Sequence, residues 1–276
     1  MFKILKKEIL NNTVSMMKIH APYISKKALP GQFVIIRIDE FGERFPLTIF
    51  DYDRNLETID IIYQKVGTST MKLDKLNEQD YILDIVGPLG KASELENYNK
   101  TIVVSGGVGG AIACPLARRL KELGTHTEII SGFRTKDLVI LEKNMREIDN
   151  NLVICTDDGS YGRKALVTEI LQEKLNKNKY DLVVTVGPIV MMKAVCELTK
   201  KYNIKTIASM ISIMIDGTGM CGGCRLTVDG QVKFACIDGP DFDGHLIDFD
   251  EAITRNNMYR NEEKISREKY CNLKLL

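Results

Sequence analysis

A glycine-rich segment in the last quarter of the chain, DGTGMCGGCRLTVDGQVKFAC, contains three of the seven cysteines. Two residues separate Cys221 from Cys224, and eleven separate Cys224 from Cys236. Plant-type [2Fe–2S] sites combine a C-x4-C-x2-C run with a distant fourth Cys. In that pattern the first ligand falls on Asp216, whose carboxylate brings the same formal charge as a thiolate. We therefore expect a [2Fe–2S] cluster bound by Asp216, Cys221, Cys224 and Cys236.

The residues between these ligands also suit a cluster. Glycines permit positive φ angles and let backbone N–H groups point at sulfides, and the loop contains Gly217, Gly219, Gly222 and Gly223. The alternative is structural zinc on Cys221 and Cys224, with His245 or Cys271 as the fourth ligand. Zinc motifs of this type usually pair two close couples of ligands, so the spacing favours iron and sulfur.

Charge and hydropathy patterning narrow the class of protein. The chain opens MFKILKKEILNN, without an apolar secretory core, and contains no apolar run long enough to span a membrane. We expect a cytoplasmic protein, in which thiols stay reduced, so buried free thiols are the default interpretation of the scattered Cys114, Cys155, Cys196 and Cys271. Lys plus Arg number 38 against 37 acidic residues. This balance gives no basic footprint for nucleic acid or for an anionic membrane.

Two hydrophobic periodicities divide the chain. Up to about Gly90, short runs such as QFVIIRID and TIDIIYQKV alternate with Pro, Gly and Asp, which predicts an antiparallel β-barrel. From Thr101, apolar strands, glycine turns and amphipathic helices follow one another, which predicts a parallel α/β sheet. We expect a barrel domain over residues 1–98, an α/β domain over 99–210, a cluster subdomain over 211–250 and a charged, helical tail over 251–276.

Glycine turns follow several of the predicted strands. The run SGGVGG, Ser105 to Gly110, lies between a strand and a helix, where backbone amides and the helix N-terminus suit a pyrophosphate. Its spacing departs from G-x-G-x-x-G, so a tight strand-to-helix turn is the alternative. DDGSYG from Asp157 and GP from Gly187 also follow strand ends, the edge at which open α/β sheets bind ligands.

Two segments of the predicted barrel carry groups that a flavin requires. RFPLT, from Arg44 to Thr48, offers a cation and a hydroxyl at the head of a strand. VGTST, from Val66 to Thr70, offers a glycine and hydroxyls for a phosphate cradle. Taken alone, the first segment also fits an ordinary strand opening with a solvated Arg, and the second fits any polar loop.

The order of motifs, RFPLT, IYQKVGTST, GPLG, SGGVGG, DDGSYG, GP and the D-x4-C-x2-C…C loop, resembles the ferredoxin-reductase-like flavoprotein superfamily over nearly the whole chain. Within it the chain resembles electron-transfer subunits with FAD and a [2Fe–2S] cluster. These are the subunit of dihydroorotate dehydrogenase, the small subunit of sulfide dehydrogenase, and the small subunit of the electron-bifurcating NADH-dependent reduced ferredoxin:NADP oxidoreductase. The dihydroorotate dehydrogenase subunits resemble proteins with four Cys ligands. An aspartate at the first ligand position, as at Asp216, is instead similar to the sulfide dehydrogenase and bifurcating subunits.

This resemblance implies an FAD-binding barrel and an NAD(H)-binding α/β domain, with the following contacts. Arg44, Pro46, Leu47 and Thr48 surround the isoalloxazine; Ile62, Tyr63, Gln64, Ser69 and Thr70 surround the ribityl and phosphate groups; Gly106, Gly107, Val108, Gly109, Asp157, Asp158, Gly159, Gly187 and Pro188 line the NAD(H) cleft. Many relatives have the flavin Arg three residues before the hydroxyl, whereas Arg44 stands four before Thr48. NAD(H) is inferred from the resemblance, and Arg134 with Lys136 leaves NADP open.

The resemblance also implies a mechanism and a partner. NAD(H) exchanges two electrons as a hydride, whereas the cluster exchanges one electron at a time. FAD between them converts two-electron transfer into one-electron transfer. Thr48 is the expected catalytic residue beside the flavin. The expected partner is a larger flavin and iron–sulfur subunit, similar to the glutamate synthase small subunit, with NADPH and ferredoxin sites. The tail, with Tyr259, Tyr270 and residues 273–276, is a candidate docking element or a solvated helix.

Three classes of function remain open. The first is the NAD(H)-linked subunit of a bifurcating NADH-dependent ferredoxin:NADP transhydrogenase. The second uses the same electron-transfer subunit with sulfide dehydrogenase or dihydroorotate dehydrogenase. The third is a zinc-stabilised nucleotide-binding module. His20, His126 and His245 are isolated in the sequence, so the substrate chemistry is expected to belong to another chain.

Overall fold

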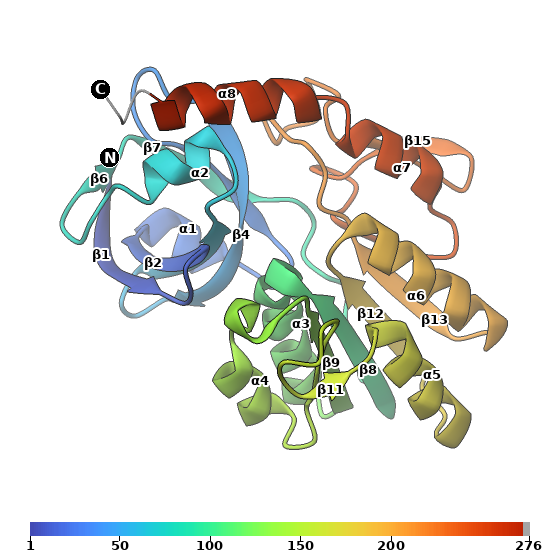
Figure 1. The fold of residues 1–276 in the computed structure, drawn as a ribbon. Coiled ribbons are helices and arrows are strands. Elements are labelled where there is room, and N and C mark those ends of the chain that lie inside the picture. Colours follow the sequence, from blue (N-terminus) through green and yellow to red (C-terminus); the bar gives the residue numbers. More distant parts are fainter. Residues whose placement is uncertain (273–276) are drawn as a thin grey trace.

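The computed structural model describes residues 1–272, and residues 273–276 of the expected docking tail lie outside the described part. Two sheets, each with its own helices, stand side by side, and the C-terminal segment lies across both (Figure 1). The predicted combination of an antiparallel barrel with a mainly parallel α/β sheet is confirmed. None of the described helices has the length and apolar character that crossing a membrane requires.

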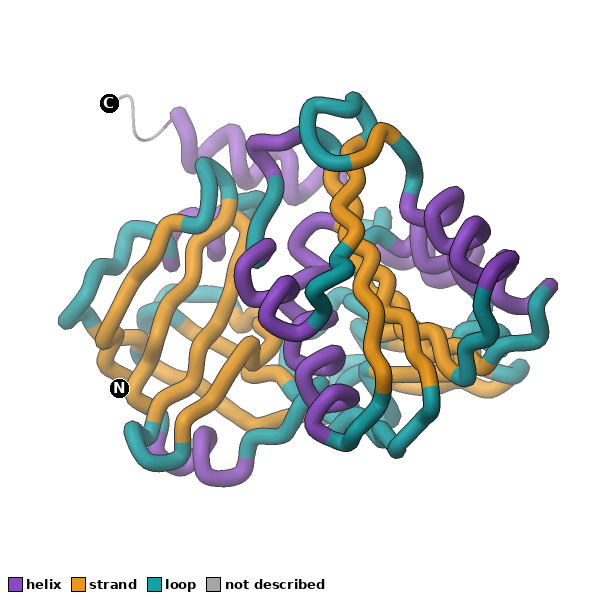
Figure 2. Tube along the Cα trace, turned by 90° about the horizontal axis from the view of Figure 1, so that it is seen from below, coloured by secondary structure: helices purple, strands orange, loops and turns teal. Residues whose placement is uncertain are grey.

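The first sheet curls into a nearly closed barrel around an apolar core (Figure 2). Its strand order is β6-β1-β2-β5-β4-β3-β7, with antiparallel pairing throughout. Alternating residues of β3, β4 and β5 face this core, as the period of a strand requires. The elements are β1 (Phe2–Ile9), β2 (Val14–His20), α1 (Pro22–Lys27), β3 (Phe33–Arg37), β4 (Arg44–Asp53), β5 (Thr58–Gln64), α2 (Thr68–Leu73), β6 (Tyr81–Ile82) and β7 (Asp84–Leu89).

The second sheet has the order β11-β10-β9-β8-β12-β13-β16, parallel except for β16 at one edge. Strands β8 and β12 pair at its centre and are almost continuously buried, because helices cover both faces of a parallel sheet. The elements are β8 (Lys100–Gly106), η1 (Gly107–Gly109), α3 (Gly110–Glu122), β9 (His126–Phe133), η2 (Lys136–Leu138), α4 (Glu142–Ile148), β10 (Val153–Thr156), β11 (Arg163–Lys164), α5 (Val167–Lys177), β12 (Leu182–Val186), α6 (Ile189–Lys201), β13 (Lys205–Ser209) and β16 (Asp241–Asp243).

The C-terminal segment contains a hairpin of β14 (Arg225–Val228) and β15 (Gln231–Phe234), followed by α7 (Phe249–Asn256) and α8 (Arg260–Asn272). Helix α8 lies beside α2 of the barrel (Figure 1), and the hydroxyls of Thr68 and Ser266 are 3.1 Å apart. Strand β16 joins the α/β sheet by pairing with β13. The segment is thus attached to both halves of the molecule, and the division at residues 98, 210 and 250 stays a prediction.

One apolar core joins all three parts. Phe33 and Ile35 of the barrel pack with Met192 and Ala208 of the α/β sheet and with buried residues of the C-terminal segment, including Cys224. Contacts of this kind hold the barrel, the sheet and the predicted cluster loop in a fixed arrangement. The site that we describe next lies at this junction.

Candidate electron-transfer site

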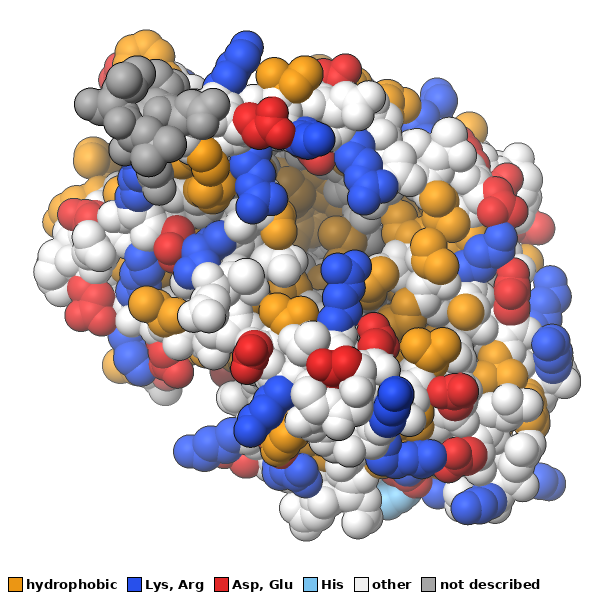
Figure 3. All heavy atoms as spheres, viewed as in Figure 1, with side chains coloured by type: hydrophobic (Ala, Val, Ile, Leu, Met, Phe, Trp, Pro, Cys, Tyr) orange, Lys and Arg blue, Asp and Glu red, His pale blue; other side chains and the backbone are white. Residues whose placement is uncertain are grey.

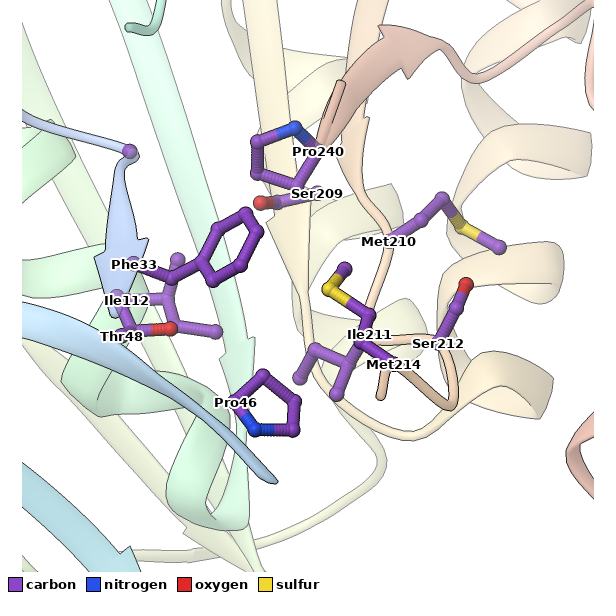
Figure 4. Close-up of a pocket in the computed structure, with 11 residues that line it drawn as sticks. Phe33, Pro46, Thr48, Ile112, Ser209, Met210, Ile211, Ser212, Met214 and Pro240 are labelled. Carbon is purple, nitrogen blue, oxygen red and sulfur yellow. The ribbon is translucent and has the colours of Figure 1, made fainter. Parts of the chain in front are cut away.

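A pocket opens where the barrel, helix α3 and the segment after β13 meet. Phe33, Pro46, Thr48 and Ile112 form one side and face Ser209, Met214 and Pro240 on the other (Figure 4). The walls are mainly apolar with a few hydroxyls, which suits a planar aromatic ring that needs a small number of oriented polar contacts. On the surface, a hollow lined by hydrophobic side chains lies where α8, the barrel and the α/β domain meet, with Lys and Arg at its rim (Figure 3).

Strand β4 supplies the predicted flavin contacts, and its alternation sorts them. Phe45 and Leu47 pack against the barrel core, whereas Pro46 and Thr48 line the pocket. Arg44 is two residues before Pro46 and therefore shares the face of Thr48. Because Arg44 stands four residues before Thr48, it lies on the pocket side of the strand. An arginine three residues before Thr48 would point into the barrel core. The side chain of Leu47 points away from the pocket, so only the backbone of Leu47 can make the predicted flavin contact.

Strand β5 shows the same alternation. Ile62 packs outside the barrel, in the core shared with α3, and Gln64 has the same parity. Tyr63 is buried in the barrel, where its hydroxyl donates to Asp74 Oδ1 at 3.0 Å. Burial, together with the charge of Asp74, raises the pKa of Tyr63 well above its usual range. Its phenol does not reach the cleft, which leaves its backbone for the predicted flavin contact.

The hydroxyls predicted for the phosphate cradle have partners within the protein. Thr70 Oγ1 donates to the carbonyl of Gly67 at 3.1 Å and accepts from the backbone N–H of Gly67 at 3.2 Å. Ser69 Oγ donates to Glu43. A phosphate at this position must therefore use backbone N–H groups or displace Glu43 from Ser69.

The predicted dinucleotide turn lies at the carboxyl end of the sheet. The strand order reverses between β8 and β12; Gly106 ends β8, and Gly187 directly follows β12. A methyl group added at Gly109 would lie 2.5 Å from the Val186 carbonyl oxygen, and one at Gly187 would lie 3.0 Å from the Gly106 nitrogen. The two turns pack too closely for side chains. Gly107 has φ +55° and faces open space, where a ligand has access. This edge, at a reversal of strand order, is where open α/β sheets bind nucleotides.

The remaining predicted nucleotide residues lie along the same edge of the sheet. Asp157, Asp158 and Gly159 follow β10 and are exposed, and Pro188 precedes α6. The side-chain and backbone hydrogen bonds of Ser160 to Asp158 lower the pKa of that carboxyl. Met191 packs against the turn, since a methyl group added at Gly106 would lie only 2.6 Å from Met191 Sδ. Met191 is thus a packing residue of this turn.

In the predicted cluster loop, hydrogen bonds link the predicted ligands in two pairs, Cys221 with Asp216 and Cys236 with Cys224. Asp216 accepts backbone N–H groups from Thr218 at 2.8 Å and Cys221 at 2.7 Å, and these hydrogen bonds lower the pKa of the carboxyl. Cys224 Sγ accepts from the backbone N–H of Cys236 at 3.4 Å. Burial is the main cause that raises the pKa of Cys236 to about 12, and the neighbouring Cys224 contributes to the same rise. Two buried sulfurs and one carboxylate therefore lie close enough to interact.

Backbone conformation and exposure in this loop also fit an iron–sulfur cluster. Gly217, Gly219 and Gly222 have positive φ angles of 73°, 85° and 68°, as a tight ligand loop requires. Cys221 is exposed, whereas Cys224 and Cys236 are buried. Among residues 1–272, no three His, Cys, Asp or Glu side chains form a group that could hold a single metal ion. A two-iron cluster shares its four ligands between two metal ions, so its ligands can be spread more widely.

The two fourth ligands considered for zinc do not support that alternative. His245 Nε2 lies 3.0 Å from Thr199 Oγ1, in the α/β domain. Cys271 belongs to α8, the helix beside the barrel. Cys114, Cys155 and Cys196 are buried free thiols, as expected, whereas Cys271 is only partly buried.

The pocket and the cluster loop adjoin each other. Met214, which lines the pocket, precedes Asp216 by two residues. A methyl group added at Gly217 would lie 2.9 Å from Ile35 Cγ1, and Ile35 is the strand partner of Pro46 in the pocket wall. The loop therefore packs on the barrel face that carries Pro46 and Thr48. Groups bound at the two sites would be neighbours.

Sequence reasoning missed much of the pocket wall. Phe33, Ile112, Met210, Ile211, Ser212 and Met214 carry no motif, and contacts between distant segments bring them together. Ser209 ends strand β13, so the rule that ligands bind at the carboxyl edge of a parallel sheet would have found it.

Comparisons with known proteins agree with this geometry. The family described as the iron–sulfur cluster binding domain of dihydroorotate dehydrogenase B matches residues 212–248, which include all four predicted ligands. A solved structure of the NADH-dependent reduced ferredoxin-NADP oxidoreductase, described for flavin-based electron bifurcation, is 43% identical with a TM-score of 0.92. It covers 98% of this chain and 97% of its own. These findings define a ferredoxin-reductase-like protein with a C-terminal iron–sulfur binding region.

Two curated proteins extend the likeness. A Thermotoga maritima homologue of the electron-transfer subunit of dihydroorotate dehydrogenase B (NAD(+)) is 44% identical, over 97% of this chain and 95% of its own. An uncharacterized Clostridium beijerinckii protein in the adh 3' region is 47% identical, over 95% of this chain and 92% of its own. The chain belongs to the family of dihydroorotate dehydrogenase B electron-transfer subunits and their homologues. The resemblance inferred from the motifs is thereby confirmed.

Proposed function

We propose that the chain is the NAD(H)-linked electron-transfer subunit of a flavin-based, electron-bifurcating oxidoreductase of the NADH-dependent reduced ferredoxin:NADP type. One observation carries the proposal: the loop with Asp216, Cys221, Cys224 and Cys236 packs on the barrel face that presents Thr48 to the pocket. The likeness to the solved oxidoreductase over 98% of the chain supports the assignment.

The residues on this face fit FAD, NAD(H) and a [2Fe–2S] cluster in distinct roles. When bound, FAD supplies the conversion between hydride transfer and single-electron transfer. Thr48 offers a hydroxyl to the ring, and Arg44, on the same strand face, offers a cation. The turn from Gly106 to Gly109 presents backbone amides at the start of α3 for a pyrophosphate. The loop ligands Asp216, Cys221, Cys224 and Cys236 hold the cluster.

The surface around the cluster loop suits a protein partner. Met220, the residue before Cys221, is 89% exposed, and Ile215 and Ile237 beside the ligands are also exposed. Exposed apolar side chains that gather on one part of a surface are typical of interaction sites. The proposed partner is a larger flavin and iron–sulfur subunit, similar to the glutamate synthase small subunit, that carries the NADPH and ferredoxin sites. A cytoplasmic location belongs to the same proposal.

A second candidate is the electron-transfer subunit of a dihydroorotate dehydrogenase. The match of residues 212–248 to the iron–sulfur domain of that enzyme favours it. The aspartate at the first ligand position favours the bifurcating type. In both candidates this chain exchanges electrons with NAD(H). The two candidates differ in the partner subunit to which the chain is joined.

The test is to purify the tagged chain anaerobically with its partner and follow three reactions. The proposal predicts flavin reduction by NADH, and NADPH-dependent NAD+ reduction that requires ferredoxin. Dihydroorotate-dependent NAD+ reduction would favour the second candidate. A complex that contains no flavin and is inert to NADH would contradict both.

A further inference from the structure

Helix α7 lies behind the predicted cluster loop and directs one cation at it. Nη2 of Arg255 donates to the carbonyl oxygens of Gly222 and Gly223, both at 3.4 Å. These two residues are the pair between Cys221 and Cys224, so the contact acts on the tightest part of the ligand loop. Gly222 also accepts the backbone N–H of Arg225 at 3.3 Å, which closes the turn from within.

The surroundings of Arg255 show that this contact is enclosed. Arg255 and Gly223 line a small cavity together with Ile213, Leu226 and Ala252. The Nε of Arg255 is buried and has no hydrogen-bond partner among the described residues. Burying a donor without an acceptor costs free energy, so an unpaired donor of this kind points to a role that requires the cation.

The nearest acid on the same helix does not satisfy this donor. Glu251 lies one turn before Arg255 on α7, and its Oε2 is likewise buried without a hydrogen-bond partner in the described part of the chain. The two side chains thus do not pair through these atoms. The guanidinium keeps its charge facing the ligand loop.

We propose that Arg255 is a positioning residue that holds the Cys221–Cys224 loop in its ligating conformation and raises the reduction potential of the cluster. The inference rests on the proposed function, because it requires the iron–sulfur centre. Reduction would add one negative charge to the cluster, and a partly buried cation beside it would stabilise that charge. The two hydrogen bonds fix the carbonyls of Gly222 and Gly223, and groups behind the ligands of a metal site commonly control its affinity.

The experiment compares the holoprotein with Arg255→Gln, Arg255→Lys and the control Arg260→Gln, which removes an exposed Arg five residues further on. For each protein, the midpoint potential of the cluster is measured by EPR-monitored redox titration. The rate of iron loss to a chelator is measured in parallel. Flavin content per chain reports folding independently of the cluster.

Arg255→Gln is expected to have a lower cluster potential than the wild type and to lose iron about tenfold faster, as a supporting group behind the ligands would predict. Arg255→Lys keeps the charge and is expected to restore the potential while iron loss stays fast, because a lysine cannot bridge both carbonyls in the same way. Arg260→Gln should match the wild type in both measurements.

Two other results would overturn the inference in different ways. If the wild type binds the cluster and Arg255→Gln, with normal flavin content, keeps the wild-type potential and iron retention, then the role of Arg255 is wrong and the proposed function stands. If the wild type binds no iron–sulfur cluster, the proposed function fails and the role of Arg255 fails with it.

Discussion

Gly217, next to the predicted ligand Asp216, is packed against Ile35 of the barrel so closely that a methyl group at Gly217 would lie 2.9 Å from Ile35 Cγ1. Leu89 Cδ1 would be 2.7 Å away. Gly217 also has φ +73°, a conformation that side chains disfavour. The position of the predicted cluster loop against the barrel face with Pro46 and Thr48 therefore depends on the absence of a side chain at this residue.

Gly217→Ala is expected to destabilise the protein by about 2–3 kcal/mol, since a left-handed residue costs about 1–2 kcal/mol and overpacking adds about 1 kcal/mol or more. It should also lower the iron content. The matched control is Gly230→Ala, because Gly230 has φ +68° but no neighbouring atom within 4 Å of an added methyl group. Denaturant unfolding and iron analysis distinguish the two. Equal losses in both variants would show that the contact with Ile35 is unimportant.

Asp216 is expected to be replaceable by a thiolate but not by a methyl group. Asp216→Ala removes the ligand and the acceptor for the N–H groups of Thr218 and Cys221, so the cluster should be lost or become labile. Asp216→Cys keeps an anionic ligand and should retain the cluster at a shifted potential, because ligand type tunes the potential. Visible absorption and EPR report both outcomes. An unchanged cluster in Asp216→Ala would remove Asp216 from the ligand set.

Thr48→Val is expected to slow flavin reduction by NADH about tenfold, which corresponds to the loss of one oriented hydrogen bond. The change keeps the shape of the side chain, so FAD should stay bound. The control is Thr58→Val, because the hydroxyl of Thr58 is buried in the barrel without a partner among the described residues. Stopped-flow reduction measures the rate. If both variants are reduced at the wild-type rate, Thr48 has no role in the reaction.

Glu128 of β9 is expected to control stability in acid. Burial raises its pKa, but hydrogen bonds from Lys100 and Lys174 outweigh burial and lower the pKa to about 2 from its usual value of 4.5. Tyr180 and His126 also face this carboxyl. Because the pKa is lower in the folded state, the stabilisation is complete above about pH 4.5 and is lost as the pH falls toward 2.

Glu128→Gln should therefore lower the free energy of unfolding at neutral pH and weaken its dependence on pH between about 4.5 and 2. Glu122→Gln is the control, since the ion pair of Glu122 with Arg119 is exposed and contributes about 0–1 kcal/mol. Urea titrations over this pH range test the prediction. Parallel pH curves for the wild type and Glu128→Gln would contradict it.

Local patterns predicted the larger features of the fold. The alternation of β-branched residues predicted the barrel, and apolar strands followed by glycine turns predicted the parallel sheet, because both patterns depend on residues close in sequence. The same holds for the cluster loop, whose ligand spacing lies within one segment. The burial of Cys114, Cys155 and Cys196 also followed from their neighbours.

Side-chain directions and contacts between distant segments were harder to predict from the sequence. Leu47 and Tyr63 belong to flavin motifs, yet the strand register turns both side chains into the barrel core. The pocket wall that Ser209 to Ser212 and Met214 form, and the contact of Arg255 with Gly222, depend on how three parts of the chain dock. A single sequence contains no periodic signal for such docking.

The most direct test of the account is low-temperature EPR of the anaerobically purified, dithionite-reduced chain. One reduced [2Fe–2S] cluster predicts a rhombic signal of about one spin per chain. The account also predicts that this signal is lost or weakened in Asp216→Ala. A colourless chain that contains zinc and gives no signal would contradict it.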